Sequence, residues 1–314
     1  MGEVYRDTNQ PPIRLEVRDG NAVVGICQAL LVPARRGRHL SVPYGPITDN
    51  NPQTTHALVE ELKNQAAKHN CSFIRLSPFA PTTADPIPES LPSPLHLLAE
   101  HIWYIPLTES RIWKNEGKQT TEEEILKNMR KNTRNLIRRA EREGVTIERS
   151  EDPIKDLSAF IELHEETRKR HSFTPYSNRF FEAQVRHFGA RNECTLYKAL
   201  YQGEIIATSV HMHTFGETSY HHGASTHKYD KVPASYLLQW TAIRDALERK
   251  DHVYNFWGIS PEGMKSHPFA GVRTFKTGFG GELLELQHCV DIPLKGSYKL
   301  TRAFELARKW KRGF

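Results

Sequence analysis

The chain has 314 residues, of which 38% are hydrophobic and 25% are charged, and it carries a net charge of +6 with histidine neutral. A chain of this length can bury a sizeable core and often divides into two. The four cysteines are scattered without a CxxC pair, which disfavours a disulfide framework and a thiolate zinc site and fits a reducing compartment. No segment approaches the ~18 consecutive apolar residues of a membrane span, so any membrane association is expected to be peripheral. The basic balance suits a polyanionic partner such as tRNA, a pyrophosphate or an acidic membrane face, as well as ordinary solubility.

The first part of the chain predicts short strands around one helix. Two extended segments lie on either side of a turn at 19–21, as in a β-hairpin. Many of the prolines fall between 78 and 94, which predicts a loop there. The expected strands are 13–17, 22–31, 73–76 and 103–107, and the expected helix is 54–69.

The second part of the chain is richer in helix. One continuous helix is expected from about residue 120 to Gly144, with Thr120 or Thr121 as its N-cap and Gly144 just beyond its last turn. The further helices are expected at 154–169, 178–188, 234–249 and from 298 onward, and the strands at 145–148, 194–201, 204–213, 218–223, 253–257 and near 283–287.

Clusters of strands mixed with helices therefore occur twice along the chain. This pattern predicts an α/β fold, with mixed α+β character, in two lobes of similar size. The first lobe is expected to comprise residues 1–119 together with 289–314, and the second lobe residues 120–288.

Four segments carry a resemblance to a known family. They are Leu126–Val145, Tyr220–Ser225 (YHHGAS), Tyr254–Ile259 (YNFWGI) and Gly271–Gly281 (GVRTFKTGFGG). In order and spacing they resemble the FemABX family of aminoacyl-tRNA-dependent transferases, and the resemblance covers most of the chain. It implies two GNAT-like lobes, each with a mixed sheet flanked by helices. It also implies a cytoplasmic enzyme that transfers an amino acid from aminoacyl-tRNA to the stem peptide of a nucleotide- or lipid-linked peptidoglycan precursor, with peripheral contact to the inner membrane face allowed.

Three features qualify this resemblance. No heptad run is present, so the chain resembles the shorter family type without a coiled-coil arm. Many relatives have Asp where Asn255 stands, which removes a charge from that position. The segment Met1–Tyr5 resembles the end of a unit that normally follows an earlier strand and helix, so the first lobe is expected to lack about one such unit.

Transfer from an aminoacyl ester requires a cation or hydrogen-bond donors for the developing oxyanion, and grips on two anionic substrates. No GxSxG elbow is present, and neither a cofactor nor a metal is expected. Lys276 is the candidate catalytic residue, because the small residues Gly278–Gly281 would let a substrate come close. The resemblance implies that it stabilises the transition state or grips the acceptor end of the tRNA. The alternative interpretation is a solvated lysine on a strand.

Two aromatic residues are candidates for substrate contact. Phe275 could stack on a terminal base, although a Phe beside a turn is more often part of a core. Tyr220 is expected to donate a hydrogen bond to substrate from a strand that lines the cleft.

Arginines in two loops are candidates for binding phosphate. The resemblance implies that a basic residue near 35–38 holds the pyrophosphate of the precursor, and Arg36 and Arg38 are the candidates. The guanidinium fork pairs bidentately with phosphate oxygens, but a solvated hairpin tip explains these residues equally well. Arg170 ends a helix, where the dipole favours a cation in any case, and the resemblance implies a phosphate-binding arginine near this junction.

The expected helix at 120–144 is strongly basic on one face. Four residues with three- to four-residue spacing are predicted to contact tRNA phosphates, although a charged stripe is usually only a solvated face. They are Lys127, Lys131, Arg134 and Arg138. The basic C-terminal helix could contact tRNA or anionic lipid, or be a disordered end.

Three histidines offer a metal site only under one strand register. If His211 pairs with His221, then His211, His213 and His221 converge, whereas a shift of one residue separates them.

The sequence leaves three functions open besides aminoacyl transfer. The first is an acetyl-CoA-dependent acyltransferase, which would need glycines at the helix entry 231–237, and this segment has none. The second is a non-catalytic RNA- or precursor-binding module. The third is a transferase that acts on a different amine, in exopolysaccharide or lipid assembly.

Overall fold

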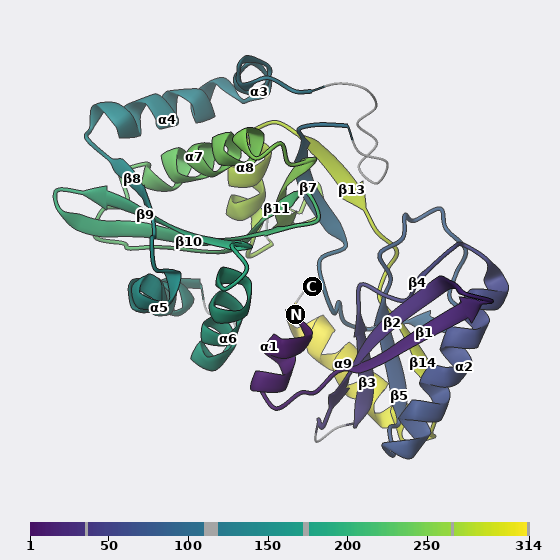
Figure 1. Cartoon of the computed structure of the whole chain (residues 1–314). Coiled ribbons are helices and arrows are strands. Elements are labelled where there is room, and N and C mark those ends of the chain that lie inside the picture. The colour runs from purple at the N-terminus through teal and green to yellow at the C-terminus, as the bar shows by residue number, and fades with distance from the viewer. Residues whose placement is uncertain (35–36, 110–118, 172–175, 265–266, 313–314) are drawn as a thin grey trace. The chain divides into compact units, whose positions relative to one another are not determined.

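The computed structural model describes residues 1–34, 37–109, 119–171, 176–264 and 267–312 (Figure 1). Two compact units are present: residues 1–101 with 284–314, and residues 102–283. Each unit contains a mixed β-sheet flanked by helices, which confirms the predicted fold class. Among the described residues, no coiled-coil arm is present, and no helix has the length and apolar character needed to cross a membrane.

The first unit is a sheet covered by a long helix. Its strands lie in the order β1-β2-β3-β5-β14-β6, and β4 pairs with β2. Leu58 and Leu62 of the long helix α2 pack against Leu40 and Ile74 of the sheet to form the core. The elements are α1 (Gly2–Asp7), β1 (Ile13–Asp19), β2 (Ala22–Val32), β3 (His39–Pro43), β4 (Ile47–Thr48), α2 (Pro52–Lys68), β5 (Phe73–Ser77), β6 (Leu91–Pro92), β14 (Val290–Pro293) and α9 (Tyr298–Arg312).

The second unit has a sheet with helices on both faces. Its strand order is β13-β7-β12-β11-β10-β9-β8, with α5 and α6 on one face and α4 and α7 on the other (Figure 1). The elements are β7 (His101–Pro106), α3 (Glu122–Asn128), α4 (Lys131–Arg142), β8 (Thr146–Arg149), α5 (Pro153–His171), α6 (Asn178–Gly189), β9 (Cys194–Tyr201), β10 (Glu204–Thr214), β11 (Glu217–Ser225), α7 (Ala234–Glu248), β12 (Val253–Gly258), α8 (Ala270–Thr277) and β13 (Glu282–Glu285).

The transition between the units comes at residue 101, earlier than the expected residue 119. The reason is strand pairing: β7 pairs antiparallel with β12, so it completes the sheet of the second unit.

The parallel pair β11 and β12 diverges along its length. Its ladder joins Glu217 to Val253 and continues only as far as the pair Ser219 and Asn255. Beyond that point β11 continues to Ser225 beside β10, whereas the end of β12 pairs with β7 on its other side. This divergence opens the sheet between β11 and β12.

The helix expected at 120–144 is two helices. α3 begins at Thr121, whose side chain forms a capping box with Glu124. Met129 and Arg130 then adopt extended backbone, with ψ of 149° and 143°, before α4 begins. The segment has no proline or glycine to signal the break. Tertiary contacts stabilise it instead: the Met129 side chain is buried and the Arg130 N–H donates to the Gly278 carbonyl at 2.9 Å.

Candidate functional site

A cavity of about 320 Å³ opens in the second unit near the divergence of β11 and β12. Its walls come from β10, β11, α7 and α8, and they combine small, hydroxyl and aromatic side chains around one amine. Such concave sites with a few convergent polar groups are typical of small-molecule binding. The residues that line it include Thr208, Ser209, Tyr220, Gly223, Gln239, Phe275 and Lys276.

Lys276 lies on α8, a helix that the sequence analysis did not predict. Its side chain is 7% exposed. Its Nζ donates a hydrogen bond to the carbonyl of Gly258, the last residue of β12, at 2.8 Å. The ring of Tyr220 lies 5.7 Å from Nζ. The alternative of a solvated strand lysine is therefore wrong.

Burial lowers the pKa of Lys276 to about 7, because a cavity with low polarity disfavours the ammonium form. No carboxylate of the described residues forms an ion pair with it. At neutral pH the side chain therefore exists as both amine and ammonium, and an amine with this pKa is suited to accept and donate protons.

Tyr220 and Phe275 also line the cavity. The Tyr220 ring lies over Gly223, where any side chain would collide with the phenol oxygen. Burial raises the pKa of Tyr220 to about 12, so its hydroxyl stays protonated and can act as a donor. Phe275 packs against Tyr236 and Phe279, with ring centroids 4.9 and 5.4 Å away. Phe275 is therefore partly a core residue as well as a wall of the cavity.

A buried chain of polar side chains reaches the cavity, and sequence reasoning missed it. The Tyr254 hydroxyl donates to Gln239 Oε1 at 2.6 Å. That hydroxyl can therefore accept from His211 Nε2, 2.8 Å away. His211 Nδ1 then accepts from the Ser209 hydroxyl at 3.3 Å. Burial holds the pKa of His211 well below 6.5, which keeps this imidazole neutral.

Thr208 adds an unsatisfied group to the same cavity. Its hydroxyl is buried and makes no hydrogen bond to the described part of the chain. Buried polar groups normally have a partner, so this hydroxyl is available to a ligand. No sequence signal identifies Thr208 or Ser209, because their position depends on the strand register.

That register also excludes the convergence of three histidines. His211 pairs with Tyr220 rather than with His221, because the ladder runs without a shift from the turn pair Thr214 and Glu217 to this pair. His213 instead lies 2.8 Å from the Thr195 hydroxyl. The only group of possible metal ligands within the described ranges lies in the first unit, at His96, Glu100 and His288.

The glycines after Lys276 pack closely against neighbouring elements, and none of them lines the cavity around Lys276. A Cβ at Gly278 would lie 2.5 Å from the Thr133 hydroxyl. At Gly281, where φ is +104°, it would lie 2.3 Å from the Tyr104 carbonyl oxygen. The glycines therefore bring the end of α8 against α4 and β7, and so hold Lys276 in place.

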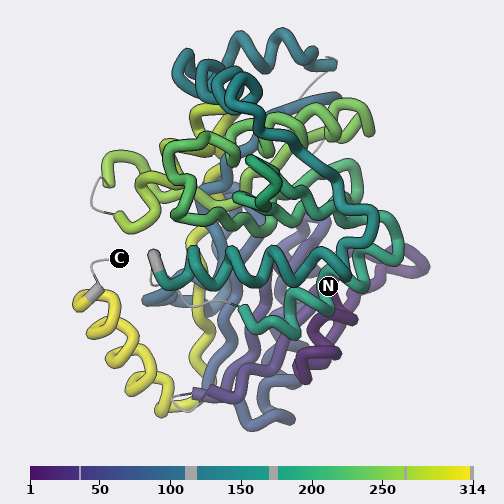
Figure 2. Tube along the Cα trace, turned by 90° about the vertical axis from the view of Figure 1, so that its left-hand side faces the viewer, coloured from purple at the N-terminus to yellow at the C-terminus, as the bar shows by residue number. Residues whose placement is uncertain are grey.

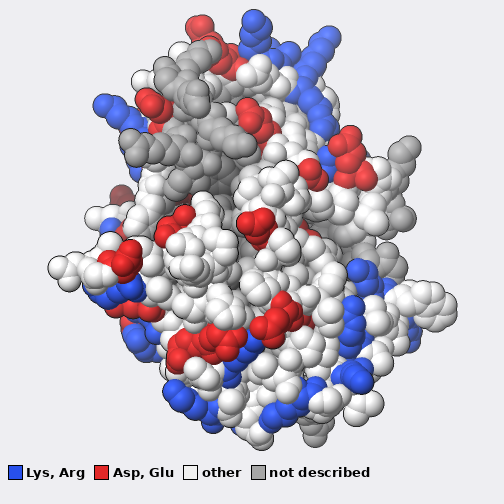
Figure 3. Space-filling model, turned by 90° about the vertical axis from the view of Figure 1, so that its right-hand side faces the viewer, with Lys and Arg blue, Asp and Glu red and all other residues white. Residues whose placement is uncertain are grey.

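The predicted tRNA-binding residues differ in their environment. Lys127, Lys131 and Arg138 are exposed, and Figure 3 shows Lys and Arg side chains projecting at the upper end of the view, where α3 and α4 lie in Figure 1. Arg134 is only half-exposed, and its Nη1 donates to the carbonyls of Leu126 and Met129 at 2.9 and 2.5 Å. It therefore caps the C-terminus of α3.

Of the three predicted phosphate-binding arginines, Arg38 is the one whose side chain the structure describes. Arg38 is exposed in the first unit and lines a groove of about 580 Å³ together with Lys295. Arg36 lies outside the described residues. Arg170 belongs to the last turn of α5, but its side chain is outside the described part.

Asn255, where many relatives have Asp, has a structural role. Its Nδ2 donates to Glu217 at 2.9 Å, and its Oδ1 accepts from the Trp257 N–H at 2.7 Å. An amide satisfies both contacts, whereas a carboxylate would face the Glu217 carboxylate.

Comparisons with known proteins agree with this geometry. The acetyltransferase (GNAT) domain family matches residues 127–267. The aminoacyltransferase FemA of Staphylococcus epidermidis is 20% identical over 374 aligned positions, which cover 92% of this chain and 88% of FemA. A crystal structure of FemX superimposes with a TM-score of 0.79 at 17% identity, covering 97% of this chain and 92% of FemX. The C-terminal domain of a putative lysylphosphatidylglycerol synthetase from Agrobacterium fabrum gives a TM-score of 0.62 at 13% identity, covering 98% and 91%.

The sheet, the divergent strand pair and the GNAT match define an acyltransferase with GNAT-like folding units. The match to FemA extends over nearly the whole chain and includes both units. Along nearly its whole length the chain is similar to FemA in sequence and to FemX in fold.

Proposed function

We propose that the cavity beside Lys276 is the site where an amino acid passes from aminoacyl-tRNA to the amine of a peptidoglycan precursor stem peptide. The observation that carries this proposal is the buried Lys276 amine in the cavity wall, held by the Gly258 carbonyl at the opening of the sheet, where burial lowers its pKa to about 7. The similarity to the aminoacyltransferase FemA over nearly the whole chain supports aminoacyl transfer and an aminoacyl donor. Such a reaction takes place where tRNA is available, in the cytoplasm, with peripheral contact to the inner membrane face allowed.

The reaction needs one bond to form and one to break. The acceptor nitrogen attacks the ester carbon of the aminoacyl group, and negative charge develops on the carbonyl oxygen. The Lys276 ammonium and the Tyr220 hydroxyl stabilise that oxyanion by donating hydrogen bonds. When the intermediate collapses, the ribose oxygen leaves with a proton from Lys276. The lysine then recovers a proton that the acceptor nitrogen has lost, so charge and protons balance.

Three surfaces would hold the two substrates. Phe275 and the Thr208 hydroxyl lie in the cavity wall, where an aminoacylated terminal nucleotide could stack and bond. The exposed cations Lys127, Lys131 and Arg138 would contact tRNA phosphates. In this proposal Arg36, Arg38 and Arg170 bind the phosphates of the precursor. Neither a cofactor nor a metal enters any step.

The test is transfer of radiolabelled amino acids. Purified protein is incubated with a set of aminoacyl-tRNAs and a peptidoglycan precursor, and label in the precursor is counted for the wild type, Lys276→Met and Lys276→Arg. A matched control is Lys68→Met, an exposed lysine on α2 of the first unit. We expect transfer by wild type and control, and a loss of about a hundredfold or more in Lys276→Met, as for removal of one oxyanion donor.

Three outcomes would contradict the proposal. Label that moves only from acetyl-CoA would indicate an ordinary acetyltransferase, and an unchanged rate in Lys276→Met would show that the cavity amine has no catalytic role. Tight tRNA binding without transfer from any donor would indicate a binding module instead.

A further inference from the structure

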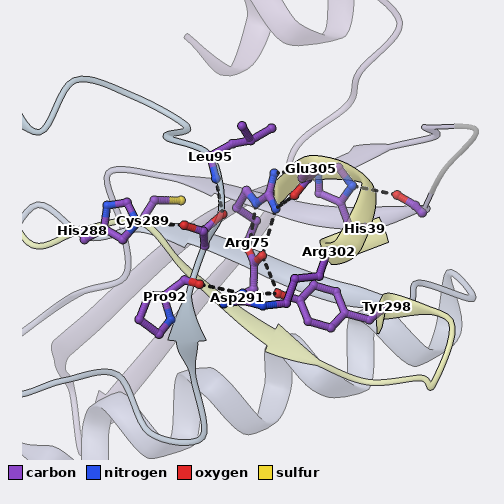
Figure 4. A network of polar contacts seen from close by, with 12 residues as sticks. His39, Arg75, Pro92, Leu95, His288, Cys289, Asp291, Tyr298, Arg302 and Glu305 are labelled. Atoms are coloured by element: carbon purple, nitrogen blue, oxygen red, sulfur yellow. Dashed lines mark hydrogen bonds and ion pairs between the residues drawn. The ribbon is translucent and has the colours of Figure 1, made fainter. Parts of the chain in front are cut away.

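Helix α9 is attached to the first unit by its polar face. Figure 4 shows the network at this attachment. The Arg75 guanidinium donates to both carboxylate oxygens of Asp291 at 2.7 and 2.9 Å, and to Glu305 of α9 at 2.7 Å. Tyr298, also of α9, donates its hydroxyl hydrogen to Asp291 at 2.8 Å. Arg302 donates to the Pro92 carbonyl at 2.7 Å.

The opposite face of α9 is apolar and exposed to solvent. Leu300 is 77% exposed, Leu306 45% and Trp310 88%. Ala303 and Ala307 lie between them and are also exposed. Positions 300, 303, 307 and 310 follow the three- and four-residue spacing of one helix face, so these side chains form a continuous row. Figure 2 shows α9, in yellow, at the edge of the first unit.

This arrangement is the reverse of an ordinary surface helix, which buries its apolar stripe and exposes its charges. A single exposed Leu or Trp needs no explanation, but a row of them marks an interaction surface. The polar network also fixes the orientation, because rotating α9 to bury the row would leave Arg75 and Asp291 buried without Glu305 and Tyr298.

The charges around the row are almost all positive. Lys299, Arg308 and Lys311 are exposed on the same helix, and its only acidic residue, Glu305, is paired with Arg75. The groove beside the helix continues the pattern, because its walls combine Arg38 and Lys295 with the apolar side chain of Leu300.

This chemistry favours a membrane surface over another macromolecule. The centre of a protein interface is depleted in lysine, and nucleic acid offers no apolar phase for Leu300 or Leu306. An amphipathic helix with Trp and Leu on one face and cations at its borders is suited to lie in the headgroup region of an anionic bilayer. Tryptophan is itself enriched at this depth.

We propose that α9 lies flat on an anionic lipid surface, with Leu300, Leu306 and Trp310 among the acyl chains and Lys299, Arg308 and Lys311 at the phosphates. Arg38 and Lys295, in the groove at the start of α9, are placed to bind a lipid phosphate or pyrophosphate. This inference deepens the proposed function and rests on it for one consequence only: at the membrane surface the protein can also use the lipid-linked form of the precursor as acceptor.

The experiment is co-sedimentation of the full chain with vesicles. Two compositions are compared, phosphatidylcholine alone and phosphatidylcholine with about one-third phosphatidylglycerol, at low and high salt. We expect binding to the anionic vesicles that weakens at high salt, because the electrostatic part is screened. The variant Leu300→Ser/Trp310→Ser should bind at least tenfold more weakly, whereas the matched control Val23→Ser, which changes an exposed apolar residue of β2, should bind as the wild type does.

Several results would overturn the inference. The first is equal vesicle binding by the wild type and the double variant, and the second is equal binding to both vesicle types. The third is a concentration-dependent dimer that the wild type and the Val23→Ser control form but the double variant does not, which would identify a second copy as the occupant of this face. Circular dichroism is used to check that the double variant is folded. A second variant, Lys299→Glu/Lys311→Glu, keeps the apolar row and should also lose binding to the anionic vesicles.

The experiments distinguish a failure of the proposed function from a failure of this inference. Transfer to a water-soluble, nucleotide-linked precursor reports the catalytic site without a membrane. Loss of vesicle binding with normal transfer to the soluble precursor in the double variant supports both. Normal vesicle binding by a wild type that transfers no amino acid to any precursor would refute the proposed function alone.

Discussion

Lys276 on α8 is hydrogen-bonded to the carbonyl of Gly258, the residue that ends β12, at 2.8 Å. This one contact ties the candidate catalytic amine to the edge of the divergent strand pair. A carbonyl accepts from either the amine or the ammonium, so the contact positions the nitrogen without fixing its protonation state.

Lys276 should make stability depend on pH. Burial lowers its folded pKa from 10.5 to about 7, so between these values the unfolded chain binds more protons than the folded chain. The contribution of this group to the free energy of unfolding therefore rises with pH from about 7 toward 10.5. Lys276→Met removes the group, and the melting temperature of the variant should increase less with pH over this window. Parallel curves for wild type and variant would contradict a buried amine with a lowered pKa.

Gly281→Ala should destabilise the second unit more than a glycine substitution that is strained by its backbone conformation alone. The new Cβ would lie 2.3 Å from the Tyr104 carbonyl oxygen, at a φ of +104°. A cost of about 1–3 kcal/mol from the backbone conformation is expected, with the collision added to it. Gly203→Ala is the matched control, because its φ is also positive, at +81°, but nothing lies near the new Cβ. Denaturant unfolding measures both, and equal losses would argue against the close packing of α8.

Arg134 and Arg138 should behave differently, although the sequence predicts tRNA contact for both. Arg138→Ala removes an exposed cation, so tRNA affinity should fall and the slope of log affinity against log salt should decrease by about one, with stability unchanged. Arg134→Ala removes the cap of α3, so it should lower the melting temperature. Filter binding at several salt concentrations, together with thermal melts, separates the two effects. A stable Arg134→Ala protein would refute the capping role.

Arg75→Ala should be among the most damaging substitutions in the first unit. It leaves Asp291 buried and Glu305 half-buried without their common partner, and breaking a buried ion pair costs about 3–5 kcal/mol. Arg18→Ala is the control, since Arg18 pairs with Glu16 at an exposed site, where an ion pair contributes little to stability. Urea unfolding monitored by a probe in the first unit measures the loss of stability in both variants. A loss below about 1 kcal/mol for Arg75→Ala would contradict a stabilising role of the buried ion pair.

The pair of Glu100 and His288 should stabilise the first unit at mildly acidic pH. Hydrogen bonds from His288 and His96, opposed by burial, bring the pKa of Glu100 down to about 2, so its contribution is present above the unfolded value and is lost as pH falls toward 2. The hydrogen bond to Glu100 raises the pKa of His288, so its contribution is present below 6.5 and is lost as pH rises through the folded value. His288→Gln should remove the loss of stability that occurs as the pH rises through the folded pKa of His288. Thermal melts from about pH 4 to 9 would detect this change. An unchanged pH profile would contradict the coupling.

Much of the fold could be predicted from the sequence, because local patterns carry it. The alternating segments at 13–17 and 204–213 form β1 and β10, and Thr121 caps α3 as its position before three glutamates indicates. The prediction fails where tertiary contacts override propensity. Nothing local marks the break at Met129 and Arg130, which depends on Gly278 and therefore on residues about 150 positions away in sequence.

The candidate site was only partly predictable for the same reason. Lys276, Tyr220 and Phe275 lie within segments that carry the family resemblance, and they line one cavity. Thr208 and Ser209 also line that cavity, and they lie on β10, where they pair with Ala224 and Gly223 of β11. Hydrophobic patterning does not give the register between two strands, so it cannot show which residues of β10 lie beside Tyr220 and Gly223 of β11.

Because its sheet includes strand β14, the first unit can finish folding only after the second unit has been synthesised. It pairs with β5 in the first unit, yet Asp291 follows its partner Arg75 by 216 positions, with the whole second unit between them. A ribosome therefore releases every residue of the second unit before the first unit can close its sheet. Until then β5 has an open edge, and such an edge is a template for aggregation. Slow translation or a chaperone at this stage should thus affect the yield of the first unit more than that of the second.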